Sequence, residues 1–341
     1  MPAASVVYAG RRLITNGGVT GMAKYVLRRL IGMVPTWLII MFMVVFMVRL
    51  IPGSIVDLLL QDQGGGGSYQ AGIDRAQVEH RLGLDQPVYV QYVKYVAGVA
   101  QGNLGASLWD QQSVVSLIAQ RVPVTAQVAL VAIITSVFVS IPIGVISAVR
   151  RDSPVDYLLR SISILGISVP GFAIGTAIVI FPTLWWGVTV SFKYVSFAED
   201  PIGHLKLIIP PAMVLGVQLS ASVARLTRTM MLEVLQEDYI RTARAKGLQE
   251  PKIVVKHALK NALIPVVTVL GIQITNLLGG SVITETIFAL PGLGRLMVSS
   301  IGARDYPVVQ GIVVLTAIFV MCMNLAVDVS YGYLDPRARP A

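Results

Sequence analysis

EDYIRTARAKGLQEPKIVVKHALKNALIP, residues 237–265, is the polar segment around which the apolar remainder of the chain is arranged. Its composition predicts two short helices joined by a turn. Asp238 is placed to cap the first helix, and Gly247 supplies a left-handed turn that a side chain would oppose. Pro251 suits the first turn of the second helix, and Pro265 closes the segment. Such a pair of helices between two apolar runs is a surface on which another protein can act.

One face of the first predicted helix carries small and apolar residues. Ile240, Ala243 and Gly247 recur at the spacing of a single helix face, and the arginines point elsewhere. We expect Ala243 and Gly247 to allow a close approach to the backbone of another protein. The second predicted helix carries a stripe of lysines four residues apart, at Lys252, Lys256 and Lys260. A solvated basic loop of a membrane protein is the competing interpretation.

The composition indicates a membrane protein. Of the 341 residues 55% are hydrophobic and 13% are charged, and the mean hydropathy is +0.71. The net charge of +9 is therefore a topology signal, because apolar runs long enough to cross a bilayer favour lipid over nucleic acid as the partner. The single cysteine, Cys322, lies inside an apolar run, so an intrachain disulfide is excluded.

Six apolar runs predict six transmembrane helices. Polar Gln273 and Asn276 interrupt the fifth run. The remaining chain divides into a cytoplasmic tail at residues 1–29, an extracytoplasmic region at 52–121 and a second cytoplasmic tail at 332–341. The extracytoplasmic region contains GGGGS, which has the composition of a flexible linker. The predicted spans are residues 30–51, 124–149, 158–186, 207–231, 263–284 and 306–331, and the last five form a core from 122 to 331.

The distribution of basic residues predicts the orientation. With both termini inside, 18 of the 27 lysines and arginines lie on the cytoplasmic side and 9 lie outside. Four of those outside, Arg75, Arg81, Lys94 and Arg121, fall in the long region between the first two spans, which the positive-inside rule discounts. We therefore expect both termini and the 237–265 segment to face the cytoplasm.

Four separated motifs resemble one known family. TARAKGL and HALKNALIP at 242–265, RLGLDQPVYVQYVKYVAGVAQGNLGASL at 81–108, VITETIFALPGLGRL at 282–296 and VDVSYGYLDPR at 327–337 are similar to the membrane subunits of ATP-binding-cassette importers for dipeptides and oligopeptides. The likeness covers nearly the whole chain from Lys24. Of the general coupling pattern of importer permeases only Ala243 and Gly247 match, a departure that is typical of the peptide branch.

The resemblance implies an all-α membrane protein with six transmembrane helices, the type I importer permease (MetI-like) fold and cytoplasmic termini. It implies a permease subunit of the bacterial cytoplasmic membrane that pairs with a homologous second subunit. Two cytoplasmic ATPase subunits, which bind ATP and Mg, would dock on the coupling segment. An extracytoplasmic binding protein would deliver the peptide, and this chain itself would bind no cofactor.

The resemblance also implies which residues carry function. The ATPase-coupling residues would be Asp238, Tyr239, Ile240, Arg241, Thr242, Ala243, Arg244, Ala245, Lys246 and Gly247. Candidates for the pathway or gate are Glu285 and Phe288, which match the family's motif near the external gate. Gln273 and Asn276 are candidates as well, because polar groups at membrane depth are costly unless they face a partner helix or a cavity. For Glu285 the alternative is a carboxylate that caps the next turn.

Other function classes have less support in the sequence. No GxxxxGK[ST] phosphate loop, HExxH motif or paired-cysteine metal site occurs, so this chain is not expected to hydrolyse ATP or to hold a metal. The rival function is an ion-coupled secondary transporter that works alone. It predicts carboxylates at the bilayer midplane and paired repeats of broken helices, and neither pattern is present in clear form.

Overall fold

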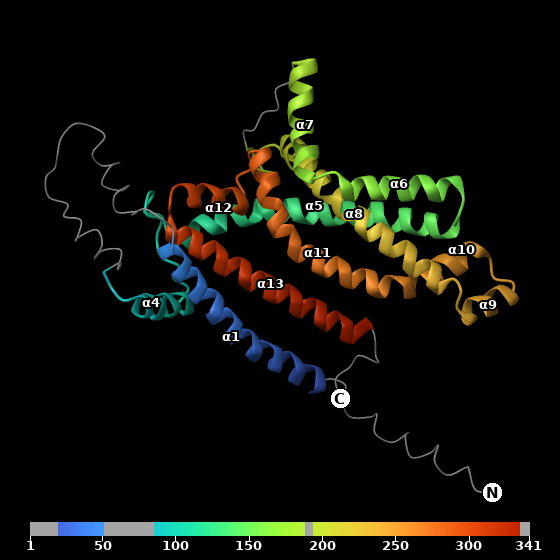
Figure 1. Ribbon diagram of the computed structural model, residues 1–341, viewed down its shortest axis with the longest axis horizontal. Helices are drawn as coiled ribbons and strands as arrows, with labels where there is room; N and C mark the ends of the chain where they lie inside the picture. The colour runs from blue at the N-terminus through green and yellow to red at the C-terminus, as the bar shows by residue number, and fades with distance from the viewer. Residues whose placement is uncertain (1–19, 51–84, 188–193, 335–341) are drawn as a thin grey trace, which may run out of the picture.

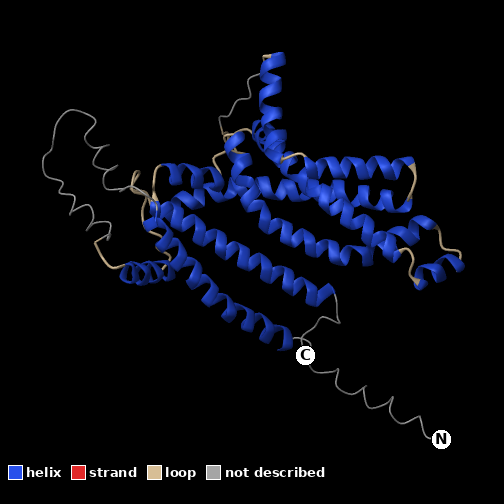
Figure 2. Cartoon of the chain, viewed as in Figure 1, coloured by secondary structure: helices blue, strands red, loops and turns tan. Residues whose placement is uncertain are grey.

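The described part of the molecule is helical (Figure 2). A computed structural model describes residues 20–50, 85–187 and 194–334. Within these ranges, the β-pairing consists of one isolated antiparallel bridge between Ala106 and Ser113. The elements are α1 Thr20–Leu50, α4 Val88–Ala100, α5 Val114–Val149, α6 Pro154–Ser168, α7 Gly171–Trp186, α8 Pro201–Val234, α9 Asp238–Ala245, α10 Glu250–Lys252, the π-helical η1 Ile253–Leu259, α11 Lys260–Ile287, α12 Leu293–Gly302 and α13 Tyr306–Leu334.

Five helices are long and apolar enough to cross a membrane, and a bent pair supplies a sixth span if it counts as one. The candidate spans are Val26–Phe46, Val114–Val149, Pro201–Val234, Glu250–Leu277 and Tyr306–Val327. Two helices extend beyond the predicted spans at their N-terminal ends: α1 begins at Thr20, before residue 30, and α5 begins at Val114, inside the region predicted to be extracytoplasmic. The Gly-rich linker and the ends of both predicted tails lie outside the described residues.

The predicted span at 158–186 is divided into α6 and α7, whose axes differ by 89°. Val169 adopts an extended conformation, with φ −86° and ψ 120°, immediately before Pro170. A proline disfavours the helical conformation of the residue before it and donates no backbone hydrogen bond, so the helix ends there. Figure 1 shows the result, because α7 projects away from the layer formed by the other long helices.

Helices α5 and α8 form the closest packed pair in the core, and glycines set the distance between them. A Cβ added at Gly144 would lie 2.6 Å from the Thr227 Cβ, and one added at Gly216 would lie 2.7 Å from the Thr135 Cβ. Small residues of this kind let two helix backbones approach closely within a membrane. The pair is the scaffold on which α6 and α11 pack.

The two ends of the long helices carry different structures. Along the long axis of the molecule, the start of α1, the end of α13 and the helices α9 and α10 lie toward one end (Figure 1). Helices α4 and α12 lie toward the opposite end. This arrangement places the predicted coupling segment on the same side as the start of α1 and the end of α13.

Candidate functional site

Helix α9 is held to the rest of the molecule by one buried face. Ile240 is fully buried and Ala243 is 8% exposed, and both pack in a cluster with Met231 of α8 and Ile253 of η1. A helix of 8 residues is marginal in water, so its stability comes from this packing. The buried face therefore fixes α9 at the end of α8.

Two expectations about this helix are wrong. Ala243 was expected to contact another protein, but it packs inside its own chain, because the apolar face that it shares with Ile240 is covered by α8 and η1. Asp238 was expected to cap the helix, but the N-cap residue is Glu237, without a side-chain cap hydrogen bond. Asp238 is instead the first residue of α9 and pairs with Arg241 at 3.2 Å on the surface.

The turn after α9 is built as the sequence predicts. Gly247 has a φ of +75°, the left-handed conformation that glycine adopts without strain. Its N–H donates to the Arg244 carbonyl at 2.9 Å, and the N–H of Leu248 donates to the Ala243 carbonyl at 3.3 Å. These two bonds are the Schellman arrangement, which ends a helix and turns the chain sharply. Leu248 then packs against the same apolar cluster as Ile240.

The exposed side of α9 presents polar and basic groups. Arg244 reaches across the turn, where its Nε donates to Glu250 Oε1 at 2.7 Å. Hydrogen bonding to that carboxylate raises the pKa of Arg244 above its ordinary value. Lys246 has no side-chain partner among the described residues. We use the term coupling surface for the exposed residues of the predicted coupling segment, which are Asp238, Tyr239, Arg241, Thr242, Arg244, Ala245, Lys246 and Gly247.

The second helix of the segment does not end at Pro265, which is a further correction. Helix α10, the π-helical turn η1 and α11 follow one another without a break, and Pro265 lies inside α11. Membrane helices tolerate a proline where neighbouring groups accommodate the freed carbonyl. The lysine stripe is exposed at all three positions. The coupling segment is thus continuous with the fifth span.

A hydrogen bond joins α9 directly to α11. The Asn261 side-chain amide donates to the Tyr239 hydroxyl at 2.8 Å. Together with the packing of Ile240 against Ile253, this bond connects the short helix to the long one at two points. Helix α9 is therefore attached to the start of the fifth predicted span.

Glu285 lies at the other end of α11 and is fully buried. Its carboxylate accepts from Thr125 Oγ1 at 2.6 Å and from the backbone N–H groups of Gly294 and Arg295 at 2.7 and 3.1 Å. Thr125 Oγ1 in turn accepts from the Leu293 N–H at 2.9 Å. This geometry supports the alternative interpretation, in which Glu285 caps the next turn. The carboxylate joins α11 to α12 and α5 through these hydrogen bonds.

The other three candidates for the pathway or gate have different surroundings. Phe288 is 4% exposed and packs in the core with Leu290. Gln273 donates from Nε2 to Ser222 Oγ at 2.8 Å and so joins α11 to α8, whereas Asn276 is exposed. The fifth span continues through both amides, so they do not interrupt the helix.

Two buried polar clusters were not predicted from the sequence. On the side of α9, Asp156 of α6 is fully buried, and the guanidinium of Arg228 in α8 binds it through two hydrogen bonds of 2.9 and 2.7 Å. Ser147 of α5 also donates to this carboxylate. The sequence gives no signal for the pair, because 72 residues separate its partners and no motif contains both.

The second of these clusters lies at the opposite end of the molecule and joins residues 107–109 to residues 303–305. Ser107 donates to Asp305 Oδ2 at 2.5 Å, and the Leu108 N–H donates to Oδ1 at 3.2 Å. Trp109 Nε1 donates to the Ala303 carbonyl at 2.9 Å. These bonds fasten the hairpin before α5 to the turn between α12 and α13.

Comparison with known proteins identifies the family. The family described as binding-protein-dependent transport system inner membrane component matches residues 140–340, and the model of its N-terminal region matches residues 22–129. The chain belongs to this family of importer permeases. The importer permease is 38% identical to the dipeptide transport system permease protein DppB of Escherichia coli K12, over 93% of this chain and 99% of the relative.

Further relatives are also peptide permeases by name. A putative peptide transport system permease protein of Brucella abortus is 40% identical, and the di/tripeptide transport system permease protein DppB of Pseudomonas aeruginosa is 38% identical. Each comparison covers 93% of the importer permease and 99% of the relative. A solved inward-facing structure of the MetNI methionine ABC transporter shares the fold, with a TM-score of 0.53 and 20% identity over 64% of this chain and 96% of that chain.

These findings confirm the type I fold and the permease function predicted from the sequence. The importer permease is a multi-pass protein of the cytoplasmic membrane and the translocation component of an ABC importer. The alternative, a secondary transporter that works alone, is not supported.

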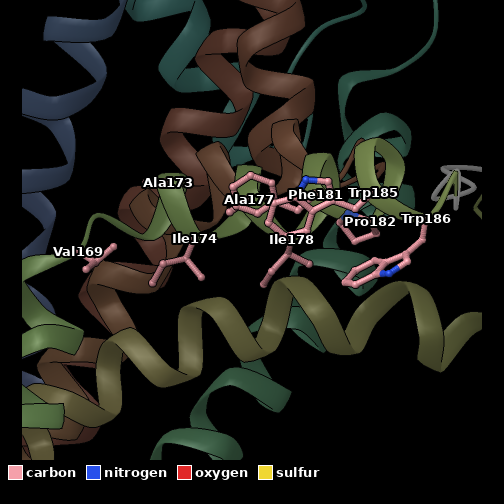
Figure 3. Close-up of a pocket in the computed structure, with 9 residues that line it drawn as sticks. All are labelled: Val169, Ala173, Ile174, Ala177, Ile178, Phe181, Pro182, Trp185 and Trp186. Carbon is pink, nitrogen blue, oxygen red and sulfur yellow. The ribbon is translucent and has the colours of Figure 1, made fainter.

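Helix α7 gives the importer permease a large apolar surface. A shallow groove of ≈ 550 Å³ runs along it (Figure 3). Trp185 and Trp186 are 67% and 70% exposed at one end of the helix, and Phe181 stacks on Trp185 with a centroid distance of 4.8 Å. The groove is lined by Val169, Ala173, Ile174, Ala177, Ile178, Phe181, Pro182, Trp185 and Trp186. Aromatic side chains of this kind suit a lipid or protein contact within the membrane.

Proposed function

We propose that this chain forms one half of a membrane pathway for dipeptides and oligopeptides, which an extracytoplasmic solute-binding protein delivers. The names of the three relatives support a peptide substrate. The identity extends over almost their full length, so the likeness includes the spans as well as the coupling segment.

The second half of the pathway is a homologous permease subunit. The apolar groove on α7 supports this part of the proposal, because α7 projects from the helix layer and exposes Trp185 and Trp186 (Figures 1 and 3). Packing against another helix would bury these rings. The exposed Asn276 and the partly exposed Gln273 are the pathway candidates that remain accessible in the described structure.

The end that carries α9 faces the cytoplasm in this proposal. The positive-inside rule supports the orientation, since the topology predicted from the sequence assigns 18 of the 27 lysines and arginines to the cytoplasmic side. The arrangement in Figure 1 supports it too, because α9, the start of α1 and the end of α13 lie toward one end.

The energy comes from two cytoplasmic ATPase subunits, which bind ATP and Mg and dock on the coupling surface. One observation carries this step: the apolar face of α9 is buried in its own chain and its polar face is left exposed. Motion of the ATPases would displace α9, and the contacts of Ile240 and Tyr239 would pass the displacement to α11. The buried Glu285 then links α11 to α12 and α5 at the far end.

A matched pair of variants tests the coupling surface. Ala245 is exposed on α9, and Ala119 is exposed near the start of α5 at the other end of the molecule. Ala245→Trp should reduce recovery of the ATPase subunits in a pull-down and reduce uptake of a labelled dipeptide, because the added ring occupies the docking surface. Ala119→Trp should leave ATPase recovery unchanged. Full recovery and uptake with Ala245→Trp would contradict the coupling assignment.

A further inference from the structure

A pocket of ≈ 220 Å³ lies between α5, α6 and α8, beside the buried Asp156–Arg228 pair. Arginines from two helices line it, Arg160 from α6 and Arg225 and Arg228 from α8. The other lining residues are the hydroxyl-bearing Ser147, Ser163 and Thr229 and the apolar Ile143, Leu159, Ile164 and Ala224. Of the apolar side chains, Ile164 is 57% exposed. The pocket is therefore cationic on one side and open to an apolar environment on the other.

The charge of this pocket is not balanced by the protein. Asp156 engages Arg228 with both carboxylate oxygens, so that pair is internally neutral. Arg160 lies 5.8 Å from the centre of the Tyr157 ring, which carries no negative charge. Arg225 has no carboxylate partner among the residues that the structure describes. Two guanidinium groups thus remain available for an external anion.

The position of the pocket along the helices corresponds to a membrane surface. Residues 207–224 of α8 contain no Asp, Glu, Lys or Arg, and Arg225 follows them directly. Arg160 precedes a second uncharged stretch, residues 161–186, which the 89° bend at Val169 divides between α6 and α7. Arg225 therefore stands where an uncharged stretch of membrane-spanning length ends, which is the level of the lipid headgroups, and Arg160 lines the same pocket.

We propose that this pocket binds the headgroup of an anionic phospholipid of the phosphatidylglycerol class. The phosphate would lie between the guanidiniums of Arg160 and Arg225, because guanidinium and phosphate form strong charge-assisted hydrogen bonds. The acyl chains would leave past Ile164, on the open side of the pocket. A bound lipid would join α6 to α8 beside the Asp156–Arg228 pair, on the side of the molecule that carries α9.

The test compares two double variants of equal charge change in the assembled importer. Arg160→Gln/Arg225→Gln removes the two uncompensated charges of the pocket, and the control Arg150→Gln/Arg151→Gln removes two exposed charges from the turn outside it. Each complex is delipidated, supplied with phosphatidylglycerol and analysed by native mass spectrometry for retained lipid. Phosphatidylcholine of the same chain length is supplied in a parallel arm, and millimolar inorganic phosphate in another.

We expect the parent complex and the control variant to retain one more phosphatidylglycerol than the pocket variant. In the pocket variant, retention of this lipid should be about tenfold or more weaker than in the parent complex. Phosphatidylcholine should not replace it, and inorganic phosphate should not displace it. Equal retention by the pocket variant would overturn the proposal, and so would displacement by inorganic phosphate, which indicates a simple anion site. An equal loss in the control variant would overturn it as well, because bulk charge would then account for binding. None of these outcomes depends on the peptide substrate.

Discussion

Replacing Ile240 by alanine should weaken the packing of α9 against α8 and η1. Ile240 is fully buried against Met231 and Ile253. The other contacts of α9 and its turn include the small Ala243, the partly buried Leu248, the exposed ion pair of Arg244 with Glu250 and the hydrogen bond between Tyr239 and Asn261. An Ile→Ala change in a core costs about 2–5 kcal/mol, and an Ile→Val change costs about 0.5–1.5 kcal/mol. A loss of about 3 kcal/mol lowers the ratio of docked to released α9 about 100-fold.

Hydrogen exchange followed by mass spectrometry measures this ratio directly. Backbone amides in α9 and its closing turn should exchange much faster in Ile240→Ala than in the parent, and Ile240→Val should fall between them. Val255→Ala is the matched control, because Val255 lies on η1 and is 63% exposed. Dipeptide uptake should fall in the same order as amide protection. Unchanged protection in Ile240→Ala would refute the view that burial of this side chain holds α9.

Three other predictions address separate parts of the chain. Glu285→Ala should lower the thermal stability of the complex and its uptake together, because the carboxylate accepts three hydrogen bonds in a buried site; a loss of uptake at full stability would indicate a substrate contact instead. Gly247→Val should reduce coupled uptake through backbone strain of about 1 kcal/mol or more at its positive φ, and Gly247→Asn, which tolerates that conformation better, should retain more uptake. Cysteines at Ser68 and Asp110 should react with a membrane-impermeant reagent in sealed cells, whereas one at Gln249 should not; labelling at Gln249 would contradict the orientation.

The spans were predictable because their signal is long and redundant. An apolar run such as that of α13 indicates a membrane helix whatever its exact ends are. The ends themselves were less predictable: α5 starts at Val114 because amphipathic turns before the apolar run pack against α12 and α13, and hydropathy does not register that packing. The break at Pro170 was also missed. Pro142 and Pro265 remain inside helices, so the presence of a proline alone does not predict where a membrane helix bends.

The coupling segment shows what periodicity can and cannot specify. The spacing of Ile240 and Ala243 predicted one small and apolar face on a short helix, and that face exists. The spacing does not say what covers the face, and here the chain covers it with its own α8 and η1. The turn at Gly247 was predictable because a local backbone requirement has a local sequence signal. The Asp156–Arg228 pair has none, since only the folded chain brings its partners together.

The glycine contacts between α5 and α8 also restrict how the permease can change shape. A slide of α5 by one helical turn would bring Ser140 or Ala148 to the place of Gly144, where a Cβ has no room beside Thr227. The second contact, of Gly216 with Thr135, blocks the same slide from the other helix. Both contacts therefore oppose a slide of α5 along α8 by a full helical turn. A change between inward and outward access would then move the pair as a unit, with the bending left to connections such as the one at Val169.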